Sequence, residues 1–156
     1  MLRMNKLADY GTVVMVFLAN HAGELASARD IAADTHLSLP TVSKVLKRLL
    51  AAGLLISVRG SLGGYRLKHS ARDISVAEIL YALDEPRGLT ECSLEPDACA
   101  LHNVCHVQDN WRLISQSIEA ALESVSLQAL AKPVIPPENL NKMKQVMMGV
   151  SRVESE

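Results

Sequence analysis

The chain has 156 residues, a formal net charge of −1, 49% hydrophobic residues and only 3% aromatic residues. So few aromatic side chains argue against a protein that binds single strands by base stacking, and no apolar run is long enough to span a bilayer. With no signal peptide in the sequence, we expect a cytoplasmic protein of one domain, or of one domain plus an appendage, with reduced thiols and no membrane partner.

The charge is distributed unevenly along the chain. Residues 1–72 hold ten Lys or Arg and four acids, a net charge of +6, whereas residues 73–130 hold two bases and ten acids, a net charge of −8. A basic first half indicates a polyanionic partner, although charge blocks are also common on faces that meet only water.

The first predicted elements are two helices. Residues 7–18 are apolar almost all round, which predicts a helix that is buried on most sides. Ser27 and Asp30 have the spacing of a capping box, in which each side chain accepts a hydrogen bond from the other residue's backbone N–H. This box opens a second, short helix, and the polar residues 35–38 then form a tight turn.

A third helix is predicted over residues 40–52, because Pro40 suits a first helical turn and Gly53 suits the position just past the end. Its apolar face consists of Val42, Val45, Leu46, Leu49 and Leu50. The other face has short polar residues first and bases after them, as in the recognition helix of a helix-turn-helix. The predicted DNA contacts here are Ser38, Pro40, Thr41, Ser43, Lys44, Lys47 and Arg48. An ordinary surface helix is the alternative.

A glycine-rich hairpin follows this helix. Residues 55–58 and 65–68 read as short strands on either side of Arg59-Gly60-Ser61-Leu62-Gly63-Gly64. Glycines allow the tip to take positive φ and to approach a duplex closely, and Arg59 is placed to enter a minor groove or contact a phosphate. Three helices followed by a hairpin predict a winged helix, with Arg59 and Gly60 as DNA contacts of the wing.

All three cysteines of the protein lie close together in the acidic half. A second capping box, Ser75 with Glu78, opens another short helix before them. Cys92, Cys99 and Cys105 then fall in a polar segment that we expect to be a loop with no core in which to bury them. Clustered thiols on a flexible loop favour a soft-metal or iron–sulfur site, which needs one ligand more than these thiols supply. A group of redox-active thiols is the alternative.

The last predicted helix is long and amphipathic. Its apolar residues recur at three- and four-residue steps: Trp111, Ile114, Ile118, Leu122 and Val125. Such a seam needs a partner surface, and we expect a two-fold homodimer, which would match the half-sites of an operator. Packing on its own domain is the alternative. The proline-containing tail from about residue 131 is expected to be mobile.

Together these residues resemble the family of winged-helix iron–sulfur transcription regulators that contains IscR and NsrR. The resemblance runs to about residue 130 and is carried by four stretches: Lys6-Leu7-Ala8-Asp9-Tyr10-Gly11, Leu39-Pro40-Thr41-Val42-Ser43-Lys44, Val58-Arg59-Gly60 with Gly63-Gly64-Tyr65, and the three cysteines followed by Trp111. The residues of the first two stretches, together with Gly88-Leu89-Thr90-Glu91-Cys92, are most similar to the branch that regulates SUF cluster assembly.

The resemblance implies a cluster held by Cys92, Cys99 and Cys105, either 2Fe–2S or 4Fe–4S, and it leaves the fourth ligand open. IscR-like members have a histidine three residues after the third cysteine, where this chain has Gln108. Asp9 matches the aspartate that NsrR-like members supply from the partner subunit, so we favour Asp9. His106 and His102 are local alternatives, of which His106 comes next, and an exogenous or absent ligand is the last alternative. IscR-like members also have a glutamate where this chain has Ser43, which predicts a different base preference.

The predicted fold is mostly α, a winged helix-turn-helix with a β-hairpin wing and a long C-terminal dimerisation helix. Its predicted parts are a DNA-binding domain (1–85), a cysteine-rich cluster loop (86–106), the dimerisation helix (107–130) and a mobile tail (131–156). The predicted function is a cluster-sensing, sequence-specific repressor of SUF- or ISC-type assembly genes, not an enzyme. A regulator of the same fold that senses nitric oxide or redox state, with a cluster or bare thiols, is the alternative. A thiol redox enzyme is less favoured, because the chain has no Cys-X-X-Cys pair and no nucleotide loop.

Overall fold

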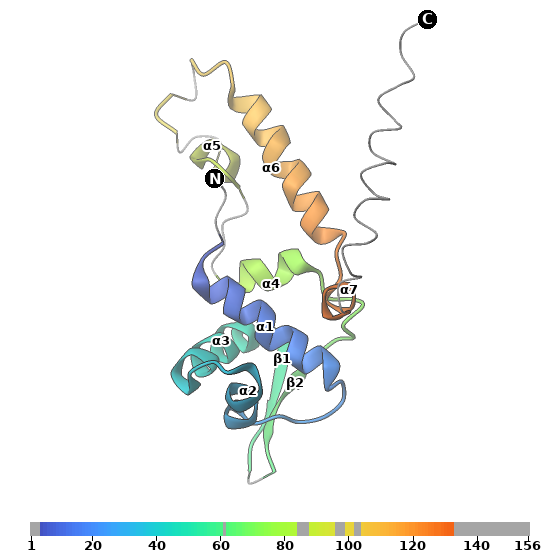
Figure 1. The fold of residues 1–156 in the computed structure, drawn as a ribbon. Coiled ribbons are helices and arrows are strands. Elements are labelled where there is room, and N and C mark those ends of the chain that lie inside the picture. Colours follow the sequence, from blue (N-terminus) through green and yellow to red (C-terminus); the bar gives the residue numbers. More distant parts are fainter. Residues whose placement is uncertain (1–3, 61, 84–87, 96–98, 102–103, 133–156) are drawn as a thin grey trace, which may run out of the picture.

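The computed structural model describes residues 4–60, 62–83, 88–95, 99–101 and 104–132. In these ranges the first half of the chain forms three helices and a hairpin, and the second half is helical (Figure 1). The elements are α1 (Lys6–Asn20), α2 (Ala28–Thr35), α3 (Leu39–Ala51), β1 (Leu55–Val58), β2 (Gly64–Leu67), α4 (Val76–Ala82), α5 (Glu91–Leu94), α6 (Gln108–Glu123) and α7 (Leu127–Ala131). The predicted winged helix is confirmed. No helix among the described residues is long and apolar enough to cross a membrane.

The first four helices begin where side-chain caps satisfy their free N–H groups. Both predicted capping boxes are present, Ser27 with Asp30 and Ser75 with Glu78. The Ser38 hydroxyl accepts a hydrogen bond from the Thr41 backbone N–H at the start of α3, and Asn5 caps α1 in the same way. Because a first helical turn leaves four N–H groups without a helical partner, these short polar side chains fix where each helix starts.

The hairpin is held along β2 by a third stretch of extended backbone. β1 and β2 are antiparallel, with Leu55 opposite Leu67 and Val58 opposite Gly64. Ala26, just before α2, exchanges backbone hydrogen bonds with Tyr65 at 3.1 and 2.8 Å. A Cβ atom at Gly64 would lie 2.6 Å from the Ala26 carbonyl oxygen, so only glycine allows this approach. The start of β2, directly after the turn of the hairpin, is therefore fixed to the segment before α2.

The core lies around α1, which is buried on most sides as predicted. The large, fully buried side chains of the core come from α1, α2, α3, β1, α7 and the segment around α4: Met15, Leu18, Ile31, Leu46, Leu49, Leu55, Ile74, Ile79, Leu83 and Leu127. α1 and α4 meet at Gly11, where a Cβ atom would collide with a methyl group of Leu83. On α3, four of the five predicted apolar residues are buried, but Leu50 is 37% exposed and the prediction for it was wrong. Leu50 follows the fully buried Leu49 and lies about 100° further round the helix, at the edge of the apolar face.

The last predicted helix is divided in two, which corrects the single helix expected over residues 107–130. α6 ends at Glu123, and the chain then turns at Ser124–Ser126 into α7. Backbone N–H groups of Leu127 and Gln128 donate to the carbonyls of Ile74 and Ala71, both at 2.8 Å. These bonds join α7 to the connection between β2 and α4. Because Leu127 is also buried in the core, the chain turns after α6 and does not continue as one helix. Residues 133–156 of the predicted mobile tail lie outside the described residues.

The capping box of α2 predicts a measurable pH dependence of stability. The Ser27 hydroxyl (2.7 Å) and then the Ser27 backbone N–H (3.1 Å) donate to the Asp30 carboxylate and hold its pKa below the ordinary 3.8. A carboxyl group with a lowered folded pKa stabilises the fold above its unfolded pKa, and the stabilisation disappears as the pH falls through the folded value. We therefore expect Asp30→Asn to lower the urea midpoint at pH 7 but not at a pH well below 3.8.

The matched control for this prediction is Asp34→Asn, an exposed acid near the other end of α2. Urea titrations of both variants and the wild type at the two pH values would test it. An equal loss for Asp30→Asn at both pH values would show that the carboxylate charge plays no part in the cap.

Candidate nucleic-acid interface and cysteine site

The predicted DNA face of α3 is exposed and basic. Ser43, Lys44 and Lys47 are exposed along it, while Thr41 and Arg48 are half-buried. The helix contains no acidic residue. Lysines on one exposed face can neutralise neighbouring phosphates, and short polar residues in the first turns can reach base edges.

The turn before α3 uses two of the predicted residues for the helix cap. The hydroxyls of Ser38 and Thr41 lie 2.7 Å apart, and Pro40 is exposed in the first turn between them. His36, the residue after α2, has a left-handed backbone with φ of 56°. This sharp turn sets the direction of α3 relative to α2.

The wing presents an exposed tip. Arg59 and Gly60 are both exposed, and Gly60 has φ of 122°, which side chains rarely tolerate. Leu62 is 91% exposed beyond them. In Figure 1 the wing, α2 and α3 occupy the lower half of the molecule. The predicted DNA contacts of α3 and of the wing therefore belong to the same part of the fold.

The short helix α5, which carries Cys92, lies at the opposite end, beside the first turns of α6 (Figure 1). We predicted a loop at Cys92, and this prediction was wrong. Cys92 lies in the one-turn helix α5, where it is only 8% exposed. α5 packs against α6, and this contact buries Cys92. Cys99 and Cys105 are half-buried, and all three residues are thiols.

Three thiols are the ligand chemistry of an iron–sulfur cluster. Within the described residues, however, no three His, Cys, Asp or Glu side chains come together to hold a metal. The three thiols fit the ligand chemistry of a cluster. To bind one, Cys92, Cys99 and Cys105 would have to come closer together, and a further ligand would have to join them.

The candidates for the fourth ligand are dispersed. Asp9 is exposed in the first turn of α1. His106 is exposed just before α6, and Gln108 is the first residue of that helix. His102 lies outside the described residues. An exposed Asp9 is open to a second copy of the chain.

Sequence reasoning missed a set of hydroxyl groups beside Cys92. The Thr90 Oγ1 atom lies 3.2 Å from Cys92 Sγ and 2.8 Å from Ser93 Oγ, and Ser115 of α6 donates to Ser93 at 3.1 Å. A signal was present, because Ser115 lies one helical turn before Ile118 on the face of α6 that is otherwise apolar.

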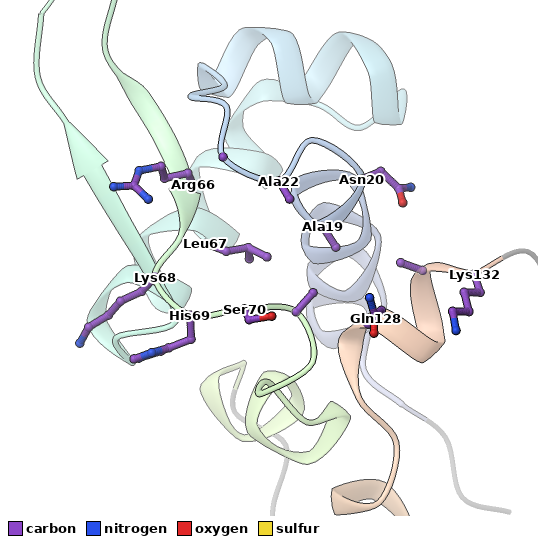
Figure 2. A pocket seen from close by; sticks show the side chains of 13 residues that line it. Ala19, Asn20, Ala22, Arg66, Leu67, Lys68, His69, Ser70, Gln128 and Lys132 are labelled. Carbon is purple, nitrogen blue, oxygen red and sulfur yellow. The ribbon is translucent and has the colours of Figure 1, made fainter.

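A cavity of about 540 Å³ lies apart from both predicted sites, between the end of α1, β2 and α7 (Figure 2). Its lining includes Leu67, Ala71 and Gln128, with Lys68, His69 and Lys132 among its bases. In Figure 2 Lys68 and Lys132 lie on different sides of the cavity. None of the residues predicted to bind DNA or a cluster lines this cavity.

A family model named Rrf2 and described as an iron-dependent transcriptional regulator matches residues 4–133. The chain belongs to the Rrf2 family. Protein rrf2 of Nitratidesulfovibrio vulgaris is 30% identical over 132 residues, which cover 84% of this chain and 88% of that protein.

Two solved structures extend the comparison. IscR of T. potens is 32% identical to this Rrf2 protein, with a TM-score of 0.65, and the match covers 83% of this chain and 85% of that one. CymR of B. subtilis, described as a global cysteine regulator, is 27% identical with a TM-score of 0.67, and the match covers 84% and 97%. The predicted resemblance is confirmed. This Rrf2 protein is a transcriptional regulator of a DNA-binding family, and its relatives are regulators rather than enzymes.

Proposed function

We propose that this Rrf2 protein is a homodimeric repressor that senses an iron–sulfur cluster through Cys92, Cys99 and Cys105. The observation that carries the proposal is the position of the three thiols, which lie within fourteen residues at the end of α6 remote from α3 and the wing. A sensor needs a group that responds to its signal without blocking the surface that binds DNA. The cysteine segment meets this requirement.

The cluster would be held by the three thiolates and by one harder ligand. We assign that fourth position to Asp9 of a second copy, with His106 as the alternative. A bound 2Fe–2S or 4Fe–4S cluster would supply a centre that responds to oxidation and to cluster supply. A carboxylate beside three thiolates binds iron less tightly than a fourth thiolate, and this lability suits a sensor.

The residues of the DNA face would act in two ways. Lys44 and Lys47 would neutralise phosphates and fix the register, whereas Thr41 and Ser43 would read base edges in the major groove. Arg59 at the wing tip would contact the adjacent minor groove or its phosphates. Ser43, where IscR-like members have a glutamate, would remove a negative charge from the base-reading position.

Coupling between the two ends requires a change in the dimer. α6 contacts both α4 and α5, and its outer face exposes Trp111, Leu113 and Ile114. A second copy would cover these residues. Closure of the cysteine segment around its ligand would then shift the population of dimers whose two α3 helices have the spacing of operator half-sites.

The regulated genes that we propose are those of SUF- or ISC-type cluster assembly. The support is the sequence similarity to IscR and the residues Lys6–Gly11 and Gly88–Cys92, which resemble the SUF-regulating branch. In such a circuit, the loaded form would repress when clusters are plentiful.

A second candidate is a regulator of the same fold that responds through its thiols without a cluster. The observation that favours it is the structural similarity to CymR, whose description names cysteine and not iron. Oxidation of Cys99 or Cys105 would then supply the signal, because both are more accessible than Cys92.

Iron counting separates the two candidates. We expect protein purified without oxygen to show a visible cluster spectrum, with iron and acid-labile sulfide in equal amounts per monomer. Asp9→Ala should lose the cluster or shift its spectrum, whereas Asp34→Ala, an exposed acid on α2, should not. A colourless wild type without iron would contradict the cluster proposal and favour the thiol regulator. A cluster unchanged in Asp9→Ala would transfer the fourth position to His106.

A further inference from the structure

Three hydroxyl groups connect Cys92 to the buried face of α6. The Thr90 Oγ1 atom is 3.2 Å from Cys92 Sγ and 2.8 Å from Ser93 Oγ. The Ser115 hydroxyl donates to Ser93 Oγ at 3.1 Å and accepts from the Leu89 backbone N–H at 3.2 Å. We refer to Thr90, Ser93 and Ser115 as the hydroxyl network. It runs without a break from a backbone donor to a cysteine sulfur.

The network is anchored at a buried side chain, while Thr90 and Ser93 are half-buried. Ser115 is the only buried polar side chain in the part of the chain that the structure describes, at 6% exposure. The turn that carries Thr90 is tight, since a Cβ atom at Gly88 would come within 2.8 Å of the Ser93 Cβ atom. A buried hydroxyl without a hydrogen-bond partner destabilises the fold. The Ser115 hydroxyl therefore has to keep its partners, Ser93 and the Leu89 N–H, whichever state the thiol adopts.

The state of Cys92 decides which way the protons point. Each hydroxyl has a single proton, and the Leu89 N–H can only donate. When Cys92 Sγ is a metal-bound thiolate it can only accept, so Thr90 must donate to it. Ser93 then donates to Thr90, and Ser115 donates to Ser93. Every proton of the network is used in this arrangement. When Cys92 is a thiol, its S–H can instead donate to Thr90.

We propose that Thr90 is a positioning residue that donates a hydrogen bond to the ligand sulfur of Cys92, and that Ser93 and Ser115 hold this donor in place. This inference rests on the proposed function, because it concerns the same cysteine as a cluster ligand. Hydrogen bonds to ligand sulfurs help to set the reduction potential of an iron–sulfur cluster, because they stabilise the more negative, reduced state. The network also joins that sulfur to α6, the helix with the exposed apolar face.

The test uses four variants of the full-length protein loaded with its cluster. Thr90→Val keeps the size of the side chain but removes the hydroxyl, and Thr90→Ser retains the hydroxyl. Ser115→Ala breaks the network at α6. Ser117→Ala is the matched control, because Ser117 is exposed on the same helix and its hydroxyl donates to the Leu113 carbonyl, outside the network. The readouts are the midpoint potential of the cluster and the exchange rate of the Leu89 amide in the cluster-free protein.

We expect Thr90→Val and Ser115→Ala to lower the midpoint potential, and Thr90→Ser and Ser117→Ala to leave it at the wild-type value. Ser115→Ala should also speed the exchange of the Leu89 amide, because it removes that amide's acceptor. Loaded Thr90→Val with an unchanged potential would overturn the inference and leave the proposed function intact. A wild type that binds no iron would overturn the proposed function, and this inference with it.

Discussion

Replacing Cys105 with alanine is expected to abolish the cluster and to change operator affinity by about 5- to 150-fold, the usual range for coupling between two sites. Cys105 is the informative choice because it is half-buried and lies outside any helix. Cys92 is buried against α6, so its replacement would also remove packing. The measurements are iron per monomer and the operator affinity, both determined without oxygen.

Wild-type protein stripped of iron is the control for this variant. If the cluster acts on DNA binding, stripped wild type and Cys105→Ala should bind the operator with the same affinity, and both should differ from loaded wild type. Equal affinity in all three would contradict any coupling between the cysteine segment and α3. If wild type purified without oxygen holds no iron, and only oxidised wild type differs from Cys105→Ala in operator affinity, the thiol regulator is the right description.

Features fixed by neighbouring residues could be predicted from the sequence. The capping boxes at Ser27 and Ser75 depend on side chains that reach only three residues along the chain, so spacing alone identifies them. The end of α3 is local for the same reason, because Gly53 takes φ of 77° just after the last turn. These local signals gave the order of elements in the winged helix.

Features that depend on distant contacts could not be predicted. α6 ends shortly before Leu127, which is buried in the core. The Leu127 N–H donates a hydrogen bond to the carbonyl of Ile74, about fifty residues earlier. The apolar spacing of residues 111–125 does not predict that contact. Ser126 was a usable local signal, since its side chain caps α7 by accepting from the Ala129 N–H.

The candidate site shows the same division. The sequence alone shows that three cysteines lie in one segment, and it also predicts the basic face of α3. The burial of Cys92 and its link to Ser115 are not, because they arise from the packing of α5 on α6 across more than twenty residues. Ligand chemistry can be inferred from residue types, whereas the surroundings that tune the ligands require the fold.

The double variant Lys44→Ala/Lys47→Ala is expected to weaken DNA binding about tenfold or more and to lower its salt dependence. Each lysine that contacts a phosphate releases counterions, and log K falls against log salt with a slope of about 0.9 per phosphate. Loss of two contacts should therefore reduce the slope by about 2 for each bound protomer. Both side chains are exposed, so the fold should be unaffected. Operator affinity measured over a range of salt concentrations tests the prediction.

Lys132→Ala is the matched control, because Lys132 is exposed at the end of α7, away from α3 (Figure 1). A general effect of net charge would weaken binding in both variants in proportion to the charge removed, whereas contact with phosphates confines the loss of slope to the α3 pair. The loss should be similar on operator and on unrelated duplexes, because phosphate contacts position the protein without reading the bases. A loss restricted to the operator would instead assign Lys44 or Lys47 to the recognition of bases, and Ser43 would no longer be the main candidate for the difference in base preference.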